Sequence, residues 1–358
     1  MNLIKLQKNF NSHSKCIKHL EKARWNKKPV CPHCASTSVT SRVLKVDRSA
    51  GSARKTPRYH CNSCNTDFTV LFGTIFEGSK MPLPKWFLLI ALMLNARTGI
   101  SAKTLMRNLG ITYKSAWYSA MRVRCAMLDQ PEMLEGVVEM DEMYVGGRPR
   151  HRTKKTADNV ASLSSVEKDD WIHRDKRKSK TGRGTDKVKV VGIVERGKEG
   201  RVALKVQEGL TGKDLLRMLK RYVRMDEWTM VMTDDFRAYN AFDNEIQHYT
   251  VNHSKKEYVR FIRGIKESIH TNTIEGVWSL IKNSIRGQYY ALSKKYLPFY
   301  LAEAAYKYNR RSTAKKAGAF DETILNTVND EKCVVSYQPK KNPKVIAYRR
   351  KKKKVSRG

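Results

Sequence analysis

Acidic residues are scarce in this chain of 358 residues. It carries 34 aspartates and glutamates against 71 lysines and arginines, and its formal net charge is +37. A positive charge of this size favours binding to a polyanion, because contacts with phosphate groups release condensed counterions and supply affinity without reading a base sequence. We therefore expect nucleic acid as the partner. From charge alone, a ribosomal-type protein or a merely solvated basic protein is the alternative.

Long apolar runs are also absent. The longest candidate, WFLLIALML at positions 86–94, is too short to cross a bilayer. The first fifteen residues lack the apolar core and the cleavage site of a secretory signal. We expect a cytoplasmic, nucleoid-associated protein without membrane contact. Its 40% hydrophobic residues suffice for two or three packed domains.

Cysteines are few, but their spacing is informative. Four of the seven form two CxxC pairs, CPHC at 31–34 and CNSC at 61–64, with 26 residues between them. This spacing predicts a zinc ribbon, because each tight turn directs two thiolates at one tetrahedral ion. The expected ligands of one structural Zn²⁺ are Cys31, Cys34, Cys61 and Cys64. The expected intracellular location disfavours a disulfide pair, and the lack of a surrounding β-α-β pattern disfavours a redox site. We interpret Cys16, Cys125 and Cys333 as ordinary thiols.

Residues 79–131 have the pattern of a helix-turn-helix segment. A helix at 84–96 precedes two short helices, which Ser101 and Thr112 cap and which a turn at Gly110 separates. The residues expected to face outward from the last helix, and to contact DNA, are Tyr113, Lys114, Ser115, Tyr118, Arg122 and Arg124. A plain three-helix bundle used for dimerisation is the alternative.

From position 135 the pattern becomes that of a mixed α/β domain. Strands are predicted at 135–147, 187–197, 201–210, 228–235 and 248–254, and helices at 212–225 and 271–286. A basic insertion at 148–187 has almost no core-forming residues, so we expect a mobile loop that orders on DNA. The predicted domains are 1–78 (N-terminal helix and zinc ribbon), 79–131 (helix-turn-helix), 132–311 (α/β domain) and 312–358 (basic C-terminal tail).

Three carboxylates in this domain predict an active site. Asp141 lies on the first strand, Asp234 at the end of a buried strand and Glu275 on the last helix. This order is typical of an RNase H-like site that binds two Mg²⁺ or Mn²⁺ ions, which need hard oxygen ligands for phosphoryl transfer. Glu275 and Lys282, seven positions apart, flank one apolar stripe of the helix together.

Neighbouring residues remain alternatives to these three. Asp235 could replace Asp234. Glu139 or Glu142 could replace Asp141, and we expect both to lie on the opposite face of the strand from it. A Glu on its own is more often a helix-surface residue than a metal ligand.

Several blocks of sequence in fixed order resemble insertion-sequence transposases of the ISXO type. The blocks, spread over residues 12–311, include RWNKKPVCPHC, YHCNSCNTDFTV, GTIFEGSKMPL, EMDEMYVGG, TDDFRAYN, VNHSKKEYVR and HTNTIEGVWSLIK. The resemblance implies a multidomain α/β chain, in which a zinc ribbon and a helix-turn-helix precede an RNase H-like DDE catalytic domain. It also implies Asp141, Asp234 and Glu275 as metal ligands and Lys282 as a DNA-contacting residue. Arg286 is a further expected DNA contact. The third acidic position varies among such proteins, so Asn272 is a further candidate, and His253 and His270 are expected nearby in structural roles.

The resemblance implies Mg²⁺-dependent cleavage of double-stranded DNA at terminal inverted repeats, followed by strand transfer into target DNA. Synapsis of two ends predicts a homodimer or larger assembly on DNA. Two alternatives stay open: a non-catalytic DNA-binding regulator, and a nuclease or resolvase that cuts branched DNA without joining ends.

Overall fold

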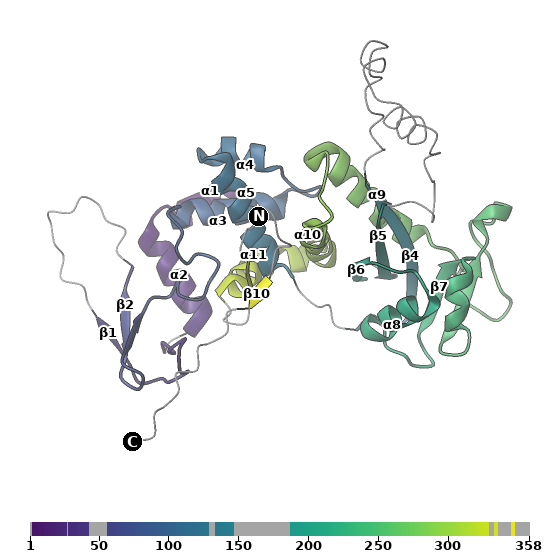
Figure 1. Ribbon diagram of the computed structural model, residues 1–358, viewed down its shortest axis with the longest axis horizontal. Helices are drawn as coiled ribbons and strands as arrows, with labels where there is room; N and C mark the ends of the chain where they lie inside the picture. The colour runs from purple at the N-terminus through teal and green to yellow at the C-terminus, as the bar shows by residue number, and fades with distance from the viewer. Residues whose placement is uncertain are drawn as a thin grey trace, which may run out of the picture.

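The computed structural model describes residues 2–26, 28–42, 56–128, 133–146, 187–328, 333–335 and 345–347. The predicted basic insertion up to residue 186, and the lysine-rich end of the chain from 348, lie outside these residues. Figure 1 shows a zinc-ribbon region and a helical region on one side, and an α/β region on the other. Within the described residues, no helix is long and apolar enough to cross a membrane.

The N-terminal region joins two helices to a small sheet. Helices α1 (Leu3–Asn9) and α2 (His13–Trp25) precede strands β1 (Val39–Arg42), β2 (Arg58–Cys61) and β3 (Thr66–Phe68), which form an antiparallel sheet in that order. The Trp25 ring packs edge-on against Tyr59 and Phe68, with centroids 5.0 Å and 6.0 Å away. These contacts tie α2 to the sheet.

The helical region follows the predicted pattern of caps and turns. It contains α3 (Leu83–Asn95), α4 (Ala102–Leu109) and α5 (Tyr113–Ala126). Side chains of Ser101 and Thr112 accept hydrogen bonds from backbone N–H groups three residues ahead, at 3.1 Å and 3.2 Å. Gly110 ends α4 in the left-handed conformation that glycine favours. The predicted helix boundaries are therefore confirmed to within a residue or two.

The sequence predicts a basic tail over residues 312–358, but the structure has helix α11 (Thr313–Val328) at the start of this segment. Phe320, Ile324 and Val328 of this helix are buried in the same core as α2 and α3. The Tyr306 hydroxyl on α10 (Leu297–Asn309) lies 2.9 Å from the Thr323 hydroxyl. Phe320, Ile324 and Val328 are four positions apart, which is a helical spacing that the sequence already contains. The lysine-rich sequence that follows led to the whole segment being interpreted as a tail.

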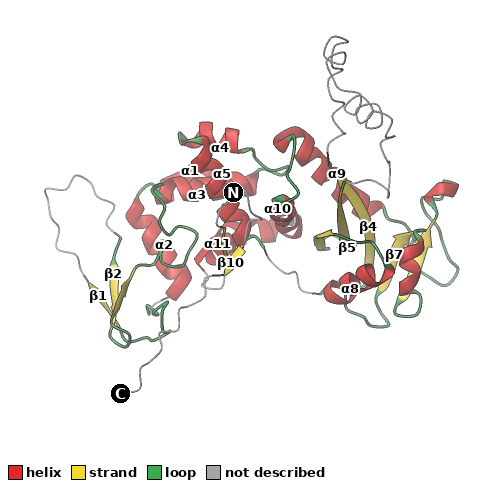
Figure 2. Ribbon diagram, viewed as in Figure 1, coloured by secondary structure: helices red, strands yellow, loops and turns green. Residues whose placement is uncertain are grey.

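A five-stranded sheet forms the α/β region, in the order β6-β5-β4-β7-β8. Its strands are β4 (Val137–Val145), β5 (Val188–Glu195), β6 (Val202–Gln207), β7 (Met230–Asp234) and β8 (Gln247–Val251). Strands β4, β5 and β6 are antiparallel, whereas β7 and β8 run parallel to β4. Helix α8 (Gly212–Tyr222) covers one face, and α9 (Asn272–Ser284) with α10 covers the other (Figure 2).

Helix α9 packs unusually close to the sheet at Gly192. A Cβ atom added to this glycine of β5 would lie 2.5 Å from the Trp278 ring and 3.0 Å from the Ile274 side chain. Only a residue without a side chain therefore lets α9 approach strands β4 and β5 at this point.

We expect Gly192→Ala to displace α9 and to destabilise the protein by about 1–3 kcal/mol, the usual cost of overpacking a core. Gly276→Ala on the same helix is the matched control, because its added Cβ would meet nothing within 4 Å apart from the nearby backbone of its own helix. That change should leave stability unchanged or raise it by up to about 1 kcal/mol. Urea unfolding measures both, and equal effects would contradict the close packing.

Candidate active site and zinc centre

Three carboxylates meet where the parallel strands β4 and β7 lie side by side. The register pairs Glu139 with Met232, so that Asp141 lies level with Asp234 at the end of β7. Carboxylate oxygens of Asp141, Glu142 and Asp234 lie within 4.8 Å of one another, and all three residues are half-buried. Oxygen ligands at this spacing suit a hard divalent cation. We call these three residues the acidic cluster.

Asp141 is the most strongly perturbed member of the acidic cluster. Burial raises its pKa to about 7, and the negative charges of Glu142 and Asp234 add to the effect. The indole Nε1 of Trp278 on α9 opposes this rise by donating a 2.8 Å hydrogen bond to Asp141 Oδ2. Carboxylates that crowd in a partly desolvated site repel one another, and a bound cation would relieve that repulsion.

Backbone and hydroxyl donors fix the other two members. Asp234 Oδ1 accepts a 3.1 Å hydrogen bond from the backbone N–H of Phe236. Glu142 Oε2 accepts a 3.0 Å hydrogen bond from the buried hydroxyl of Tyr239. Asp235, the alternative to Asp234, is exposed and accepts a 2.6 Å hydrogen bond from Asn252 instead. The structure therefore brings Asp234, and not Asp235, into the acidic cluster.

Glu142 extends from the face of β4 opposite to Asp141, as predicted, yet its carboxylate reaches the acidic cluster. Its hydrogen bond to Tyr239 places it on the side of the sheet that carries α8. Strand β7 ends at Asp234, which is level with Asp141. Beyond that point β7 no longer separates the two faces of the sheet, so the Glu142 carboxylate can approach Asp141 and Asp234 from the α8 side. Sequence alternation alone could not show this, because it does not tell where the neighbouring strand stops.

The prediction that Glu139 lies on the opposite face from Asp141 is wrong. The two residues are two positions apart on β4, so their side chains share the face that packs on α9. Glu139 is fully buried and accepts hydrogen bonds from the Thr273 hydroxyl at 2.8 Å, the Ile274 N–H at 2.9 Å and Arg196 at 2.6 Å. It therefore caps the N-terminus of α9 and fixes this helix to β4.

Glu275 does not join the acidic cluster in the described structure. It lies in the first turn of α9, and its side chain is 56% exposed. Trp278, which contacts Asp141, is three positions further on and so shares a face of the helix with it. Lys282 and Asn272 are also exposed on α9, and Arg286 is exposed just beyond its end.

Both predicted histidines have hydrogen-bond partners. His253 Nε2 lies 3.0 Å from the Thr271 hydroxyl and 3.9 Å from a carboxylate oxygen of Glu275. His270 Nδ1 lies 3.1 Å from Glu139 Oε1, and burial together with the charge of Arg196 lowers its pKa. These contacts agree with structural roles next to the N-terminus of α9.

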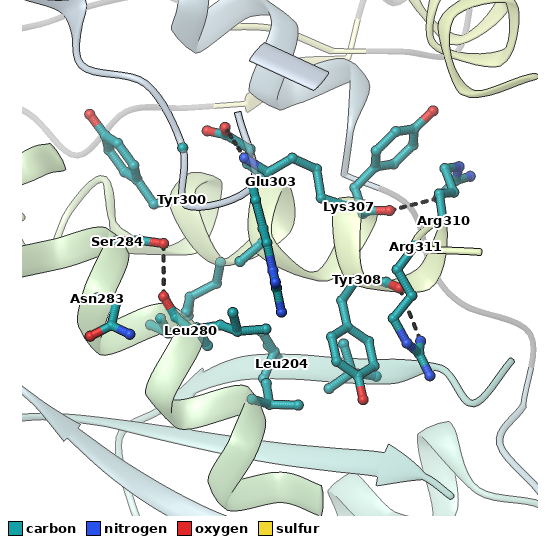
Figure 3. A pocket seen from close by; sticks show the side chains of 18 of the residues that line it. Leu204, Leu280, Asn283, Ser284, Tyr300, Glu303, Lys307, Tyr308, Arg310 and Arg311 are labelled. Atoms are coloured by element: carbon teal, nitrogen blue, oxygen red, sulfur yellow. Dashed lines mark hydrogen bonds and ion pairs between the residues drawn. The ribbon is translucent and has the colours of Figure 1, made fainter. Parts of the chain in front are cut away.

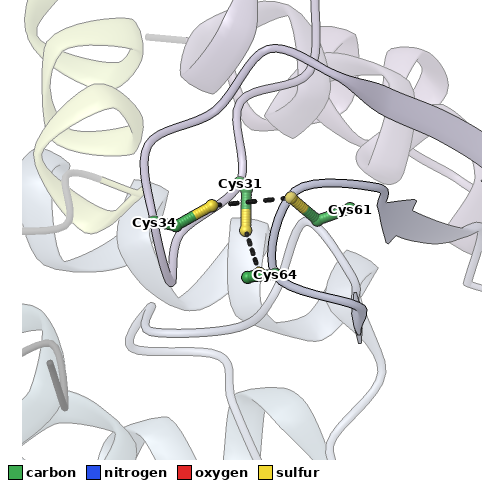
Figure 4. A group of neighbouring side chains, drawn as sticks. All are labelled: Cys31, Cys34, Cys61 and Cys64. Carbon is green, nitrogen blue, oxygen red and sulfur yellow. Dashed lines mark hydrogen bonds between the residues drawn. The ribbon is translucent and has the colours of Figure 1, made fainter. Parts of the chain in front are cut away.

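The four cysteines of the CxxC pairs converge at the tip of the zinc ribbon (Figure 4). The Sγ atoms of Cys31 and Cys64 are 3.6 Å apart, and those of Cys34 and Cys61 are 3.5 Å apart. Tetrahedral zinc with Zn–S bonds of about 2.3 Å needs sulfur separations of about 3.8 Å, so the set fits one structural ion. Burial opposes ionisation of Cys61, but N–H donors of Cys64 and Ser63 and the neighbouring thiols prevail and lower its pKa to about 6.

Of the thiols outside the CxxC pairs, Cys16 and Cys125 are buried, and burial raises the pKa of Cys16 to about 12. Nothing about the Cys333 side chain is described.

Two of the residues predicted to contact DNA are buried instead. Arg122 is 9% exposed and donates to the backbone carbonyls of Ile75 and Glu77 at 2.6 Å and 3.0 Å. Arg124 is 2% exposed and donates to Glu303 of α10 at 2.7 Å. The prediction that they face outward is therefore wrong, because the second half of α5 packs against neighbouring segments.

The first turn of α5 is the part that remains open to a partner. Tyr113 is 52% exposed, and Lys114 and Ser115 are also exposed. Tyr118 is half-buried, with its ring 5.0 Å from the guanidinium of Arg122.

A cavity of about 720 Å³ lies between the helical region and the α/β region (Figure 3). Leu204, Leu280, Tyr300 and Tyr308 are among its lining residues, and the ion pair between Lys307 and Glu303 forms part of its wall. It includes no member of the acidic cluster, so it is separate from the candidate active site.

We expect Asp141→Asn to stabilise the cation-free protein at alkaline pH. The pKa of Asp141 in the folded protein is about 7, against 3.8 for an ordinary aspartate. Above pH 7 the ionised Asp141 therefore destabilises the folded state. This cost falls as the pH drops through 7, because the folded state takes up its proton first. The variant should therefore have the higher Tm at pH 8 without added divalent cations, and the difference should shrink towards pH 5.

With added Mn²⁺ at pH 8, the wild-type protein should instead have the higher Tm, because only the wild-type acidic cluster keeps its full negative charge to bind the ion. Asp235→Asn, which removes an exposed carboxylate outside the cluster, is the matched control. Equal Tm values for wild type and Asp141→Asn across this pH range would contradict the account of Asp141.

Both sites lie in segments of the chain that match known families of transposase domains. The ISXO2-like transposase domain matches residues 133–309, and the transposase zinc-ribbon domain matches residues 11–67. A protein of Halobacterium salinarum described as an uncharacterized protein in transposable element ISH50 is 30% identical over 327 residues, which cover 89% of this chain and 98% of that protein.

Among solved structures, a simian T-cell lymphotropic virus intasome in complex with PP2A regulatory subunit B56 gamma is similar over 62% of this chain and 65% of that chain. The sequence identity is 13% and the TM-score 0.24, so this likeness supports no conclusion. The two domain matches and the ISH50 relative, together with the acidic cluster and the four converging thiols, show that this chain belongs to the ISXO2-like family of transposases.

Proposed function

We propose that this chain is an active DDE transposase, which cleaves DNA at the terminal inverted repeats of its element and transfers the freed 3′ end into target DNA. The observation that carries the proposal is that Asp141, in the middle of β4, and Asp234, at the end of its parallel neighbour β7, meet beside α9. Bound Mg²⁺ or Mn²⁺ ions would activate the attacking oxygen and stabilise the leaving one.

The order of the strands supports an RNase H-like catalytic domain. Three antiparallel strands, β4 to β6, precede two strands that run parallel to β4 on its other side. The first acid lies on the central strand and the second at the end of its parallel neighbour. This is the arrangement that the chain order of Asp141, Asp234 and Glu275 predicts for such a fold.

We propose Glu275 as the third carboxylate, although it lies outside the acidic cluster. Two ions in such a site are about 3.5–4 Å apart, so a ligand of the second ion need not lie close to all the ligands of the first. Glu275 stands on the same side of α9 as Trp278, which contacts Asp141, and Glu139 holds this helix end in place. Glu142 is the competing candidate, because its carboxylate is already in the cluster.

DNA recognition is proposed for the exposed basic and aromatic groups of two regions. Tyr113, Lys114 and Ser115 at the first turn of α5 would read the terminal repeat, together with the zinc ribbon. Lys282 and Arg286 would hold the phosphate backbone near the active site. Because both ends of an element must meet, we propose at least a homodimer on DNA.

The test is nicking of a duplex that carries the end of the element flanking this gene, in Mg²⁺ and in Mn²⁺. We expect Asp141→Asn and Asp234→Asn to lower the nicking rate by at least about a hundredfold while repeat binding persists, because metal-assisted charge stabilisation is worth several kcal/mol. Glu275→Gln should behave in the same way, and Glu142→Gln should retain more activity. Asp235→Asn is the matched control and should cut normally.

Undiminished nicking by Asp141→Asn and Asp234→Asn would remove their assigned role. Wild-type protein that binds the repeat but never cuts it would identify a non-catalytic regulator. Cutting of branched DNA without joined products would identify a nuclease or resolvase.

A further inference from the structure

The segment between β8 and α9, residues 252–271, lies directly beside the candidate active site. At its start, Asn252 donates to Asp235, and the His253 ring contacts both Thr271 and Glu275. The His253 ring centroid is also 5.8 Å from that of Tyr258. Residues 257–268, which we call the aromatic loop, therefore begin one side chain away from Glu275.

The aromatic loop has a defined backbone. Arg260 and Ile269 exchange two backbone hydrogen bonds, at 2.9 Å and 2.8 Å, which close the loop at its base. Ile262 packs against the buried Met232 and Val251. Since neighbouring side chains of an extended segment point in opposite directions, anchoring of Ile262 turns Phe261 outward.

Two aromatic rings are left facing solvent in this loop. Phe261 is 79% exposed and Tyr258 is 61% exposed. Burying a ring of this size is among the most favourable contributions a side chain can make, so a pair held outward on a closed loop indicates a surface that another molecule covers.

The charges around these rings favour a nucleic acid over a protein as that molecule. The exposed basic residues of the segment are Lys255, Lys256, Arg263 and Lys266. They outnumber its two acidic residues, Glu257 and Glu267. Lysine is depleted at protein interfaces, whereas aromatic rings interleaved with basic groups are the pattern that binds unpaired nucleotides by stacking and phosphate contact.

We propose that Phe261, supported by Tyr258, stacks on a DNA base that is unpaired next to the cleaved phosphodiester. This inference rests on the proposed function and deepens it, because it assigns to the aromatic loop the task of holding the DNA end open. A stacked duplex hinders access to a backbone linkage, and an inserted ring lowers the free-energy cost of unpairing by replacing the lost base stacking. The basic residues hold the flanking phosphates.

The experiment places 2-aminopurine, one position at a time, along the last base pairs of an element-end duplex. Binding is measured in Ca²⁺ to suppress cutting. We expect wild-type protein to raise the fluorescence at one position next to the cleavage site, because the base there leaves its stack. Phe261→Ala should abolish most of that rise, and Phe261→Trp should retain it.

Trp228→Ala is the matched control. Trp228 is 80% exposed, but it precedes β7 and so lies at the strand end opposite to Asp234, roughly 20 Å away. This variant should behave as wild type. Both substituted rings are exposed, so neither change removes part of the core.

A second readout is the cleavage rate on paired and mismatched ends. Phe261→Ala should cut the paired duplex about tenfold more slowly, the size expected for loss of one stacked base. A two-base mismatch at the end should restore its rate to within about twofold of wild type, because the bases no longer need to be separated.

The outcomes separate this inference from the proposed function. No fluorescence rise with wild-type protein, an equal rise with Phe261→Ala, or a defect that the mismatch does not relieve would each overturn the role of the aromatic loop, even if wild-type protein cuts normally. Wild-type protein that opens the end in Ca²⁺ but never cuts in Mg²⁺ or Mn²⁺ would uphold the loop and contradict the proposed activity.

Discussion

Mutual repulsion among the carboxylates of Asp141, Glu142 and Asp234 is the constraint on which the account of the α/β region depends. Their oxygens lie within 4.8 Å of one another in a chain with more than twice as many basic as acidic residues, yet no Lys or Arg ion pair neutralises Asp141 in the described structure. Its pKa of about 7 shows how unfavourable full ionisation is there. A divalent cation would balance such a site, and the same cation would offset the repulsion between these carboxylates and a DNA phosphate.

The fold holds α9 against this site through three contacts of different kinds. Buried Glu139 caps the first turn, Gly192 leaves room for the helix to approach, and Trp278 donates to Asp141. None of these residues belongs to the acidic triad proposed for catalysis, but each helps to set where Glu275 lies relative to β4. The buried carboxylate of Glu139 therefore fixes the helix end from which Glu275 is proposed to act.

Local signals in the sequence carried most of what could be predicted. The cysteine spacing, the caps at Ser101 and Thr112, and the Gly110 turn each depend on a few adjacent residues, and each prediction of local structure agrees with the structure. Asp141 and Asp234 could be assigned to one active site because both lie on predicted strands. By contrast, the prediction that Arg124 faces DNA failed because its partner, Glu303, is 179 positions away on a helix whose packing the sequence does not reveal. The capping role of Glu139 was missed for the same reason.

The central claim is that Asp141 and Asp234 hold a divalent cation beside α9. Its most direct test is the anomalous X-ray signal of Mn²⁺ in crystals of the full chain bound to an element-end duplex. The account predicts a peak about 2.2 Å from a carboxylate oxygen of each of these two residues, the usual bond length for such an ion. Mn²⁺ bound elsewhere, with these carboxylates left without a metal ligand in the DNA complex, would contradict it.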